Sequence, residues 1–176
     1  MADYPVELER TRTLFDGRRV HIRPVRASDA EMEQDFVRHL SPDSRYTRFM
    51  VTMNELPAGK LKYLTDVDYE KHLALVATEQ TGDGRQHQVG SARYVVDPGG
   101  KSCEFAIMVD DDWQSSGLAG MLMFTIMDVA HARGLESMEG LVLASNHKML
   151  KFARQLGFSQ QRLADDPGTV RVFRKL

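Results

Sequence analysis

The stretch of residues 103–143 constrains the fold most, because its hydrophobic period changes twice along the chain. Residues 103–109 form an apolar run of strand length, and residues 137–143 form a second one. Between them, apolar residues recur at helical spacing from Gly117 until Gly134 stops the helix. A strand, a helix and a strand in this order predict a parallel crossover, which is right-handed by rule.

Short turns separate the other expected strands, which predicts antiparallel neighbours. Asp16 and Gly17 give the strongest of these signals, because an Asp-Gly pair suits a two-residue hairpin turn. The expected strands outside the crossover cover residues 11–15, 20–23, 72–78, 89–96, 158–163 and 170–173. The predicted fold class is therefore α/β (α+β), with a mixed, mostly antiparallel central sheet flanked by helices. We expect one domain over residues 1–176.

The sequence predicts four further helices. Ser28 and Glu31 have the spacing of a capping box, and the helix that they begin is expected to end near residue 39. The other three are expected to begin at Ser41 with Pro42, at Ala58 and at Asn146, the last one ending before Gly157. In the crossover helix, Met121, Phe124 and Met127 are expected to widen the buried face.

Charge and composition exclude several classes of function. The net charge of -2 and the pI near 6.3 provide no basic field for nucleic acid, and no apolar run is long enough to span a membrane. Cys103 is the one cysteine, and the first residues lack the features of a leader, so a cytoplasmic location is expected. The six histidines lack metal-ligand spacing, and no metal is expected.

Residues 112–120, with the sequence DWQSSGLAG, join the first crossover strand to its helix. The start of a helix has unpaired N–H groups and partial positive charge, and small residues there let a pyrophosphate approach the backbone. The turn has neither the lysine of a Walker loop nor the G-x-G-x-x-G of a dinucleotide fingerprint. An ordinary helix cap is the alternative. The turn thus predicts phosphate binding of another kind.

The motif Gln114-x-x-Gly117-x-Ala119 resembles the R/Q-x-x-G-x-G/A signature of the GNAT superfamily of N-acetyltransferases. The order of strands and helices around it matches that family. Over roughly residues 11–176, the segments IRPVRASDA, LSPDSRYTRFM, CEFAIMVDDDWQSSGLAG and LASNHKMLKFARQLGF are similar to the catalytic domain of bacterial Pat-type protein lysine acetyltransferases. The resemblance implies the GNAT acyl-CoA N-acyltransferase fold, acetyl-CoA as co-substrate and a protein lysine as acceptor.

The resemblance also assigns residues to acetyl-CoA. The amides of the turn hold the CoA pyrophosphate in this family, and the preceding strand pairs with the pantetheine arm. The residues implied are Ile107, Met108, Val109, Gln114, Ser115, Ser116, Gly117, Leu118, Ala119, Gly120 and Asn146. Among the strand residues, main-chain contacts are expected from Ile107 and Val109. For Asn146, a plain helix cap is the favoured interpretation, and a CoA contact is compatible with it.

Glu104 is the candidate general base. A lysine amine has a pKa of about 10.4, so a base must remove its proton before it attacks a thioester. Glu104 interrupts an otherwise apolar strand, where burial would raise the pKa of its carboxylate. Pat-type enzymes carry a glutamate in this strand, so the resemblance points to the same residue. A solvated strand face is the alternative.

Other candidates are weaker. Many family members have a tyrosine as general acid on the last helix, but Ala153 occupies that position here. Cys103 points away from the face of Glu104 and is expected to be structural, and Trp113 is expected to pack under the turn. The resemblance places a charged segment beside the acceptor cleft, either solvated or facing an acidic substrate: Arg45, Tyr46 and Arg48.

The leading hypothesis is an acetyl-CoA-dependent N-acetyltransferase that acts by direct attack of an amine, as a monomer or homodimer. One alternative keeps the donor and replaces protein lysine with a small amine. The other is a non-catalytic CoA-binding sensor, which the missing tyrosine at Ala153 allows and Glu104 argues against.

Overall fold

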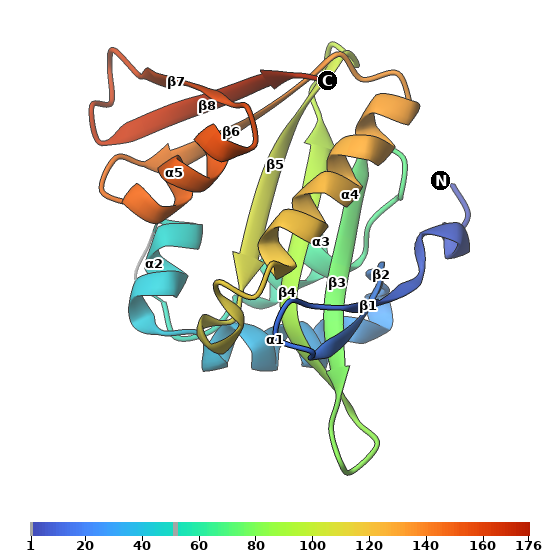
Figure 1. Cartoon of the computed structure of the whole chain (residues 1–176). Coiled ribbons are helices and arrows are strands. Elements are labelled where there is room, and N and C mark those ends of the chain that lie inside the picture. Colours follow the sequence, from blue (N-terminus) through green and yellow to red (C-terminus); the bar gives the residue numbers. More distant parts are fainter. Residues whose placement is uncertain (1, 51–52) are drawn as a thin grey trace.

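The computed structural model describes residues 2–50 and 53–176, which form an eight-stranded sheet with helices on both faces (Figure 1). The strands lie in the order β1-β2-β3-β4-β5-β6-β8-β7. Their bounds are β1 Arg10–Thr13, β2 Arg19–Pro24, β3 His72–Gln80, β4 Gln86–Val96, β5 Ser102–Val109, β6 Ser137–Leu143, β7 Ser159–Arg162 and β8 Thr169–Lys175. Every pair of neighbours is antiparallel except β5 and β6. The predicted mixed sheet with one parallel crossover is confirmed.

The helices cover the two faces of this sheet differently. They are α1 Ala30–His39, α2 Pro42–Phe49, α3 Ala58–Thr65, α4 Leu118–Ala132 and α5 His147–Gln155, with short 3-10 helices η1 Val6–Leu8, η2 Ala27–Asp29 and η3 Asp111–Trp113. Figure 1 shows α4 in front of the sheet and α1 behind it. The main core lies under α4, and a smaller one under α1 includes Phe36, Val37 and Met108. Among the described residues, no helix is long and apolar enough to cross a membrane.

The start of α1 differs from the prediction. No Ser28 side-chain cap forms there; the turn η2 precedes the helix, and Asp29 Oδ2 accepts a hydrogen bond from the Arg26 amide at 2.7 Å. The same carboxylate pairs with the buried guanidinium of Arg23, with Nη2 and Oδ1 2.8 Å apart. The Ser28 capping box was therefore wrong, because Asp29 stabilises both the turn and a buried arginine.

The buried face of α4 also differs in one position. Phe124 is 53% exposed, whereas Met123 is fully buried. The residues that face the sheet are Leu118, Leu122, Met123, Ile126, Met127 and Ala130. The predicted widening of the face by Phe124 was wrong, because the helix is rotated so that residue 123 rather than 124 meets the strands.

The parallel pairing of β5 with β6 is short. It joins only Ser102–Glu104 to Ser137–Glu139, whereas β5 remains paired with β4 as far as Val109. Phe105 lies at the point where the two strands separate. Its ring lies against Gly140, where an added Cβ atom would be only 2.6 Å from the ring. Beyond this ring the two strands diverge, and one edge of β5 has no partner strand among the described residues.

Candidate active site

The turn between η3 and α4 presents a group of free amides. Within the described residues, no hydrogen-bond acceptor is found for the N–H groups of Ser115, Ser116, Gly117, Ala119 and Gly120. Positive φ values of 63° at Ser115 and 90° at Gly117 shape the turn, and such N–H groups at a helix start favour an anion. The predicted phosphate turn thus has donors available for a pyrophosphate.

Two residues of the turn stabilise it from inside. The Ser116 side chain is buried, its hydroxyl donates to the Trp113 carbonyl at 2.5 Å, and its Oγ accepts from the Leu118 amide at 3.3 Å. The Leu118 side chain is buried in the core. Gln114 is exposed, and its amide nitrogen donates to Asp111 Oδ1 at 3.3 Å. The Leu118 amide is therefore already paired, unlike its neighbours.

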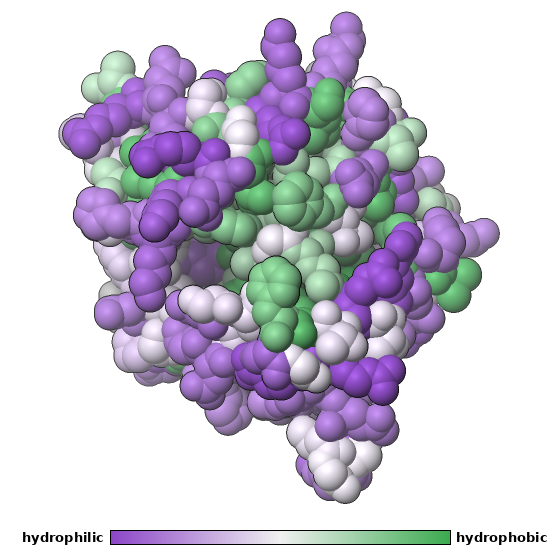
Figure 2. All heavy atoms as spheres, viewed as in Figure 1, coloured by the Kyte–Doolittle hydropathy of each residue, from purple (hydrophilic) through white to green (hydrophobic). Residues whose placement is uncertain are grey.

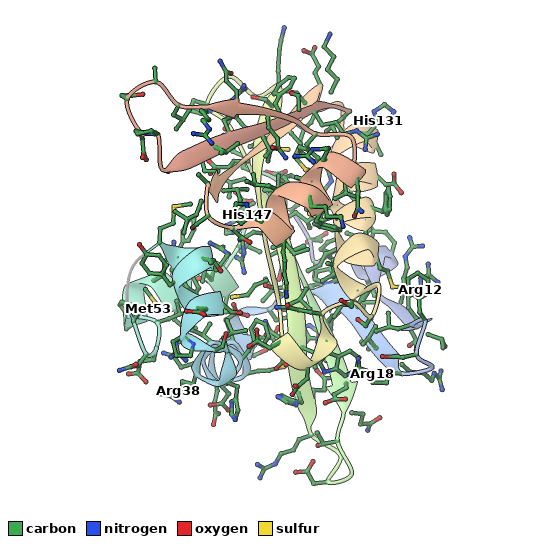
Figure 3. All side chains as sticks on the ribbon, turned by 60° about the vertical axis from the view of Figure 1, so that its left-hand side comes forward. Arg12, Arg18, Arg38, Met53, His131 and His147 are labelled. Atoms are coloured by element: carbon green, nitrogen blue, oxygen red, sulfur yellow. The ribbon has the colours of Figure 1, made fainter. Side chains whose placement is uncertain are left out.

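The β1–β2 hairpin covers this turn from one side. A Cβ atom at Gly117 would lie 2.7 Å from the Phe15 ring, and the Phe15 amide donates to the Ser116 carbonyl at 3.4 Å. Arg18 donates to the Asp112 carbonyl at 3.2 Å, and its Cζ lies 3.8 Å from the centroid of the Trp113 ring. Trp113 is 5% exposed, which confirms its predicted packing role. Figure 3 shows Arg18 beside the start of α4.

Asp111 fastens the turn to α2 from the other side. Its Oδ2 accepts from the Ser41 amide at 2.9 Å, and its Oδ1 accepts from the Ser44 hydroxyl at 2.6 Å. A carboxylate at a helix N-terminus is also favoured by the helix dipole. Sequence reasoning missed this residue, and its only signal was the run of three aspartates from Asp110 to Asp112.

The open edge of β5 offers main-chain groups to the gap. The Asp110 amide donates to Val89 of β4, and hydrogen-bonding sides alternate along a strand, so Met108 also pairs with β4. By the same alternation, the N–H and C=O groups of Ile107 and Val109 point to the β6 side. The register favours Ile107 and Val109 for a ligand in the gap, and directs Met108 away from it.

Glu104 belongs to the last β5–β6 pair, directly opposite Glu139. Its side chain lies on the face of Met108, which packs against α1, and is opposite to Cys103 and Phe105, which pack in the core under α4. Partial burial raises the pKa of the Glu104 carboxyl, and the carboxylates of Glu139 and Asp97 raise it further, while Arg48 lowers it. The pKa of this exposed carboxyl group is therefore above the ordinary glutamate value.

Asn146 caps α5, as the favoured interpretation predicted: its Oδ1 accepts from the Met149 amide at 3.2 Å. It also lines a cavity of about 450 Å³ between the start of α5 and α2. The lining residues are Asp43, Tyr46, Thr47, Ser145, Asn146, His147 and Lys148. Figure 2 shows the surface hollowed between these two helices, and Figure 3 places His147 at the start of α5.

The structure shows the surroundings of Ala153, at the position of the general acid, and of Cys103, a possible nucleophile. Ala153 is 1% exposed within the core, so its position supplies no hydroxyl group. Cys103 is fully buried, and burial, with smaller contributions from Asp97 and Glu139, raises the pKa of its thiol to about 12. Cys103 is thus structural, as predicted. In residues 2–50 and 53–176, no group of three His, Cys, Asp or Glu side chains could hold a metal ion.

Comparison with known proteins identifies the family. Residues 34–158 match the Acetyltransferase (GNAT) family. An acetyltransferase of Pseudomonas aeruginosa is 38% identical over 158 residues, which cover 90% of this chain and 84% of that protein. Acetyltransferase Pat of Mycolicibacterium smegmatis is 29% identical over 142 residues, which cover 80% of this chain but only 41% of that protein.

A solved structure extends the match to nearly the whole chain. The crystal structure of the GNAT domain of S. lividans PAT superposes with a TM-score of 0.88 at 30% identity, and covers 99% of this chain and 100% of that one. The predicted GNAT fold, the resemblance to Pat-type domains and the class of N-acetyltransferase are confirmed. The chain belongs to the GNAT family of acetyltransferases.

Proposed function

We propose that this protein transfers the acetyl group of acetyl-CoA to a primary amine, a protein lysine, with Glu104 as general base, as one domain over residues 1–176 in the cytoplasm. One observation carries this proposal: Glu104 stands where β5 and β6 part, on the face opposite to α4. The donor turn at the start of α4 and the base then lie on two sides of one gap. A thioester threaded through the gap would meet an amine held by Glu104.

The described residues fit acetyl-CoA. In the proposal, the free amides of Ser115, Ser116, Gly117, Ala119 and Gly120 bind the pyrophosphate. The pantetheine arm takes the place of a strand partner for β5. It pairs with the main chains of Ile107 and Val109, and Asn146 lies near its path. Leu118, Gln114 and Met108 are left out of direct binding, because their amide, side chain and main chain respectively have partners within the fold.

The chemistry proposed needs one proton transfer before attack and one after it. Glu104 takes the proton of the acceptor ammonium, and the neutral amine nitrogen then forms a bond to the thioester carbonyl carbon. An N–H of Ile107 or Val109 stabilises the negative charge that develops on the carbonyl oxygen. As the C–S bond breaks, the amide nitrogen loses its second proton to water, and water returns a proton to the CoA thiolate, since Ala153 provides none.

The resemblance to Pat-type protein lysine acetyltransferases supports a protein lysine as acceptor, and the similarity to the GNAT domain of S. lividans PAT and to Pat of M. smegmatis agrees with that resemblance. A small amine is the alternative acceptor. Ala153 favours a second candidate function, a CoA-binding sensor without turnover, because it removes a usual proton donor. Glu104 with its raised pKa supports an enzyme instead.

Glu104→Gln should abolish most turnover while leaving donor binding intact, because the amide cannot accept a proton yet keeps the shape of the side chain. We expect kcat to fall by about 100-fold or more, within the range of general-base catalysis. The measurement is transfer from radiolabelled acetyl-CoA to lysate proteins and to a panel of amines, with the acetyl-CoA Kd determined by calorimetry. That Kd should change by less than about twofold.

Glu136→Gln, which removes an exposed carboxylate just before β6, is the matched control and should transfer at the wild-type rate. If the wild-type protein transferred radiolabel only to small amines, the proposal of a protein acceptor would be contradicted. Binding of acetyl-CoA with no transfer to any acceptor would establish the sensor instead. Equal rates for Glu104→Gln and the wild type would rule out Glu104 as base.

The pH profile follows from the raised pKa of Glu104. Only the deprotonated carboxylate acts as base, so kcat/KM should fall as the pH falls through that pKa, which lies above the ordinary carboxyl value. Glu139→Gln removes a carboxylate that raises this pKa, so the acidic limb should move to lower pH. The measurement is kcat/KM against pH for one acceptor. An acidic limb at the same pH in both proteins would contradict this assignment.

Gly117→Ala tests the turn. Its φ of 90° is unfavourable for alanine, and the new Cβ would lie 2.7 Å from the Phe15 ring, so both the turn and the hairpin must shift. We expect the acetyl-CoA Kd to rise by about tenfold, a cost of roughly 1.4 kcal/mol. Adding Phe15→Ala relieves the clash but not the backbone strain, so it should restore part of the affinity. Wild-type affinity in Gly117→Ala would exclude the turn as the donor site.

A further inference from the structure

Arg48 is a cation without a protein partner on the face of Glu104. In the part of the chain that the structure describes, no hydrogen bond or ion pair joins its guanidinium to another residue; its Cζ lies 5.0 Å from the centroid of the neighbouring Phe49 ring. Burial lowers the pKa of Arg48 to about 10, and Arg93 lowers it further, whereas Glu33 and Glu104 raise it. The Arg48 side chain is partly buried in the last turn of α2, where the next residue, Phe49, packs against the cluster that contains Met108 on the face of Glu104.

Arg93 lies on β4 opposite Ala106, so its side chain adds a second cation to the sheet face that carries Glu104 and Met108. It is 4% exposed; its Nη1 donates to the Leu64 carbonyl at 2.8 Å and lies 3.1 Å from His72 Nε2. Its Nη2 reaches no closer than 4.0 Å to Glu33 Oε1. Burial and then Arg93 lower the pKa of His72 to about 4, so the ring is neutral at pH 7. Most partners of Arg93 are therefore neutral.

The local charge is unbalanced toward positive. Lys60 is an exposed third cation in the first turn of α3, and burial, then Arg48 and Arg93, lower its pKa. The carboxylates facing these three cations are Glu33, which is fully buried with Oε2 accepting from Gln88 Nε2 at 2.7 Å, and Glu104. When Glu104 takes a proton from the acceptor, one of these negative charges is lost. A partly buried guanidinium in such a field is best stabilised by an anion.

We propose that Arg48, with Arg93 behind it, binds a carboxylate of the acceptor, so that the acetylated amine belongs to a molecule or peptide with an acidic group near that amine. The inference rests on the proposed function, because the amine must approach Glu104. A guanidinium suits a carboxylate, since it donates two parallel hydrogen bonds. Two sources share this chemistry: the carboxyl group of a free amino acid, and an aspartate or glutamate side chain near a substrate lysine.

The test compares matched acceptors. One arm uses free amino acids and their carboxamides, and the other uses lysine peptides in which a neighbouring aspartate or glutamate is replaced by asparagine or glutamine. We expect the carboxylate member of one arm to have at least a tenfold higher kcat/KM than its amide, and to bind the CoA-loaded protein more tightly by calorimetry. The arm that shows the preference identifies the source.

Variants of Arg48 assign the preference to this residue. Arg48→Gln should remove it, and Arg48→Lys should restore part of it, because lysine keeps the charge but not the paired hydrogen bonds. Lys62→Gln, a charge loss at an exposed site on α3, should keep the full preference. Since Arg48 has no described partner and repels Arg93, Arg48→Gln should not lower the Tm.

Two results would overturn the inference without touching the proposed function. One is acetyl transfer at equal rates and equal affinities for carboxylate and amide acceptors. The other is a preference that survives in Arg48→Gln while the acidic limb of the pH profile shifts, which would mean that Arg48 acts only on Glu104. Absence of any transfer would contradict the proposed function instead, and the calorimetric comparison would still decide whether carboxylates bind.

Discussion

The early end of the β5–β6 ladder is the constraint on which the site depends. Three residue pairs join the strands, and then the Phe105 ring, set against Gly140, stands where a fourth pair would form. Main-chain groups that lose a strand partner inside a sheet need another partner, because unpaired buried N–H and C=O groups are costly. The edge of β5 around Ile107 and Val109 therefore suits an extended ligand, and Glu104 stands at the point where such a ligand would cross the sheet.

Two parts of the chain far away in sequence fix the donor turn next to this gap. At the tip of the β1–β2 hairpin, Phe15 lies against Gly117 and the guanidinium of Arg18 lies over the Trp113 ring. Asp111 binds the first residues of α2, the helix that carries Arg48. The turn is thus linked on one side to the edge of the sheet and on the other to the acceptor face. The same short turn therefore contacts elements on both sides of the proposed site.

Local signals predicted the parts of the fold that depend on neighbouring residues. The crossover of strand, turn and helix, the Ser41 cap of α2 and the Asn146 cap of α5 are found where the sequence places them. Contacts between distant segments decided the rest. The Ser28 cap failed because Asp29 pairs with Arg23, and neither the Asp111 link to α2 nor the grouping of Arg48 with Arg93 is visible without the sheet register and the position of α2.

A crystal structure of the protein with acetyl-CoA tests the central claim most directly, since the claim concerns where the donor lies relative to Glu104. We predict that the pyrophosphate is bound by the amides between Ser115 and Gly120, that the pantetheine arm lies along Ile107 and Val109, and that the thioester reaches the face of Glu104. A pyrophosphate bound away from this turn, or a thioester that remains on the α4 side with Glu104 out of reach, would contradict the claim.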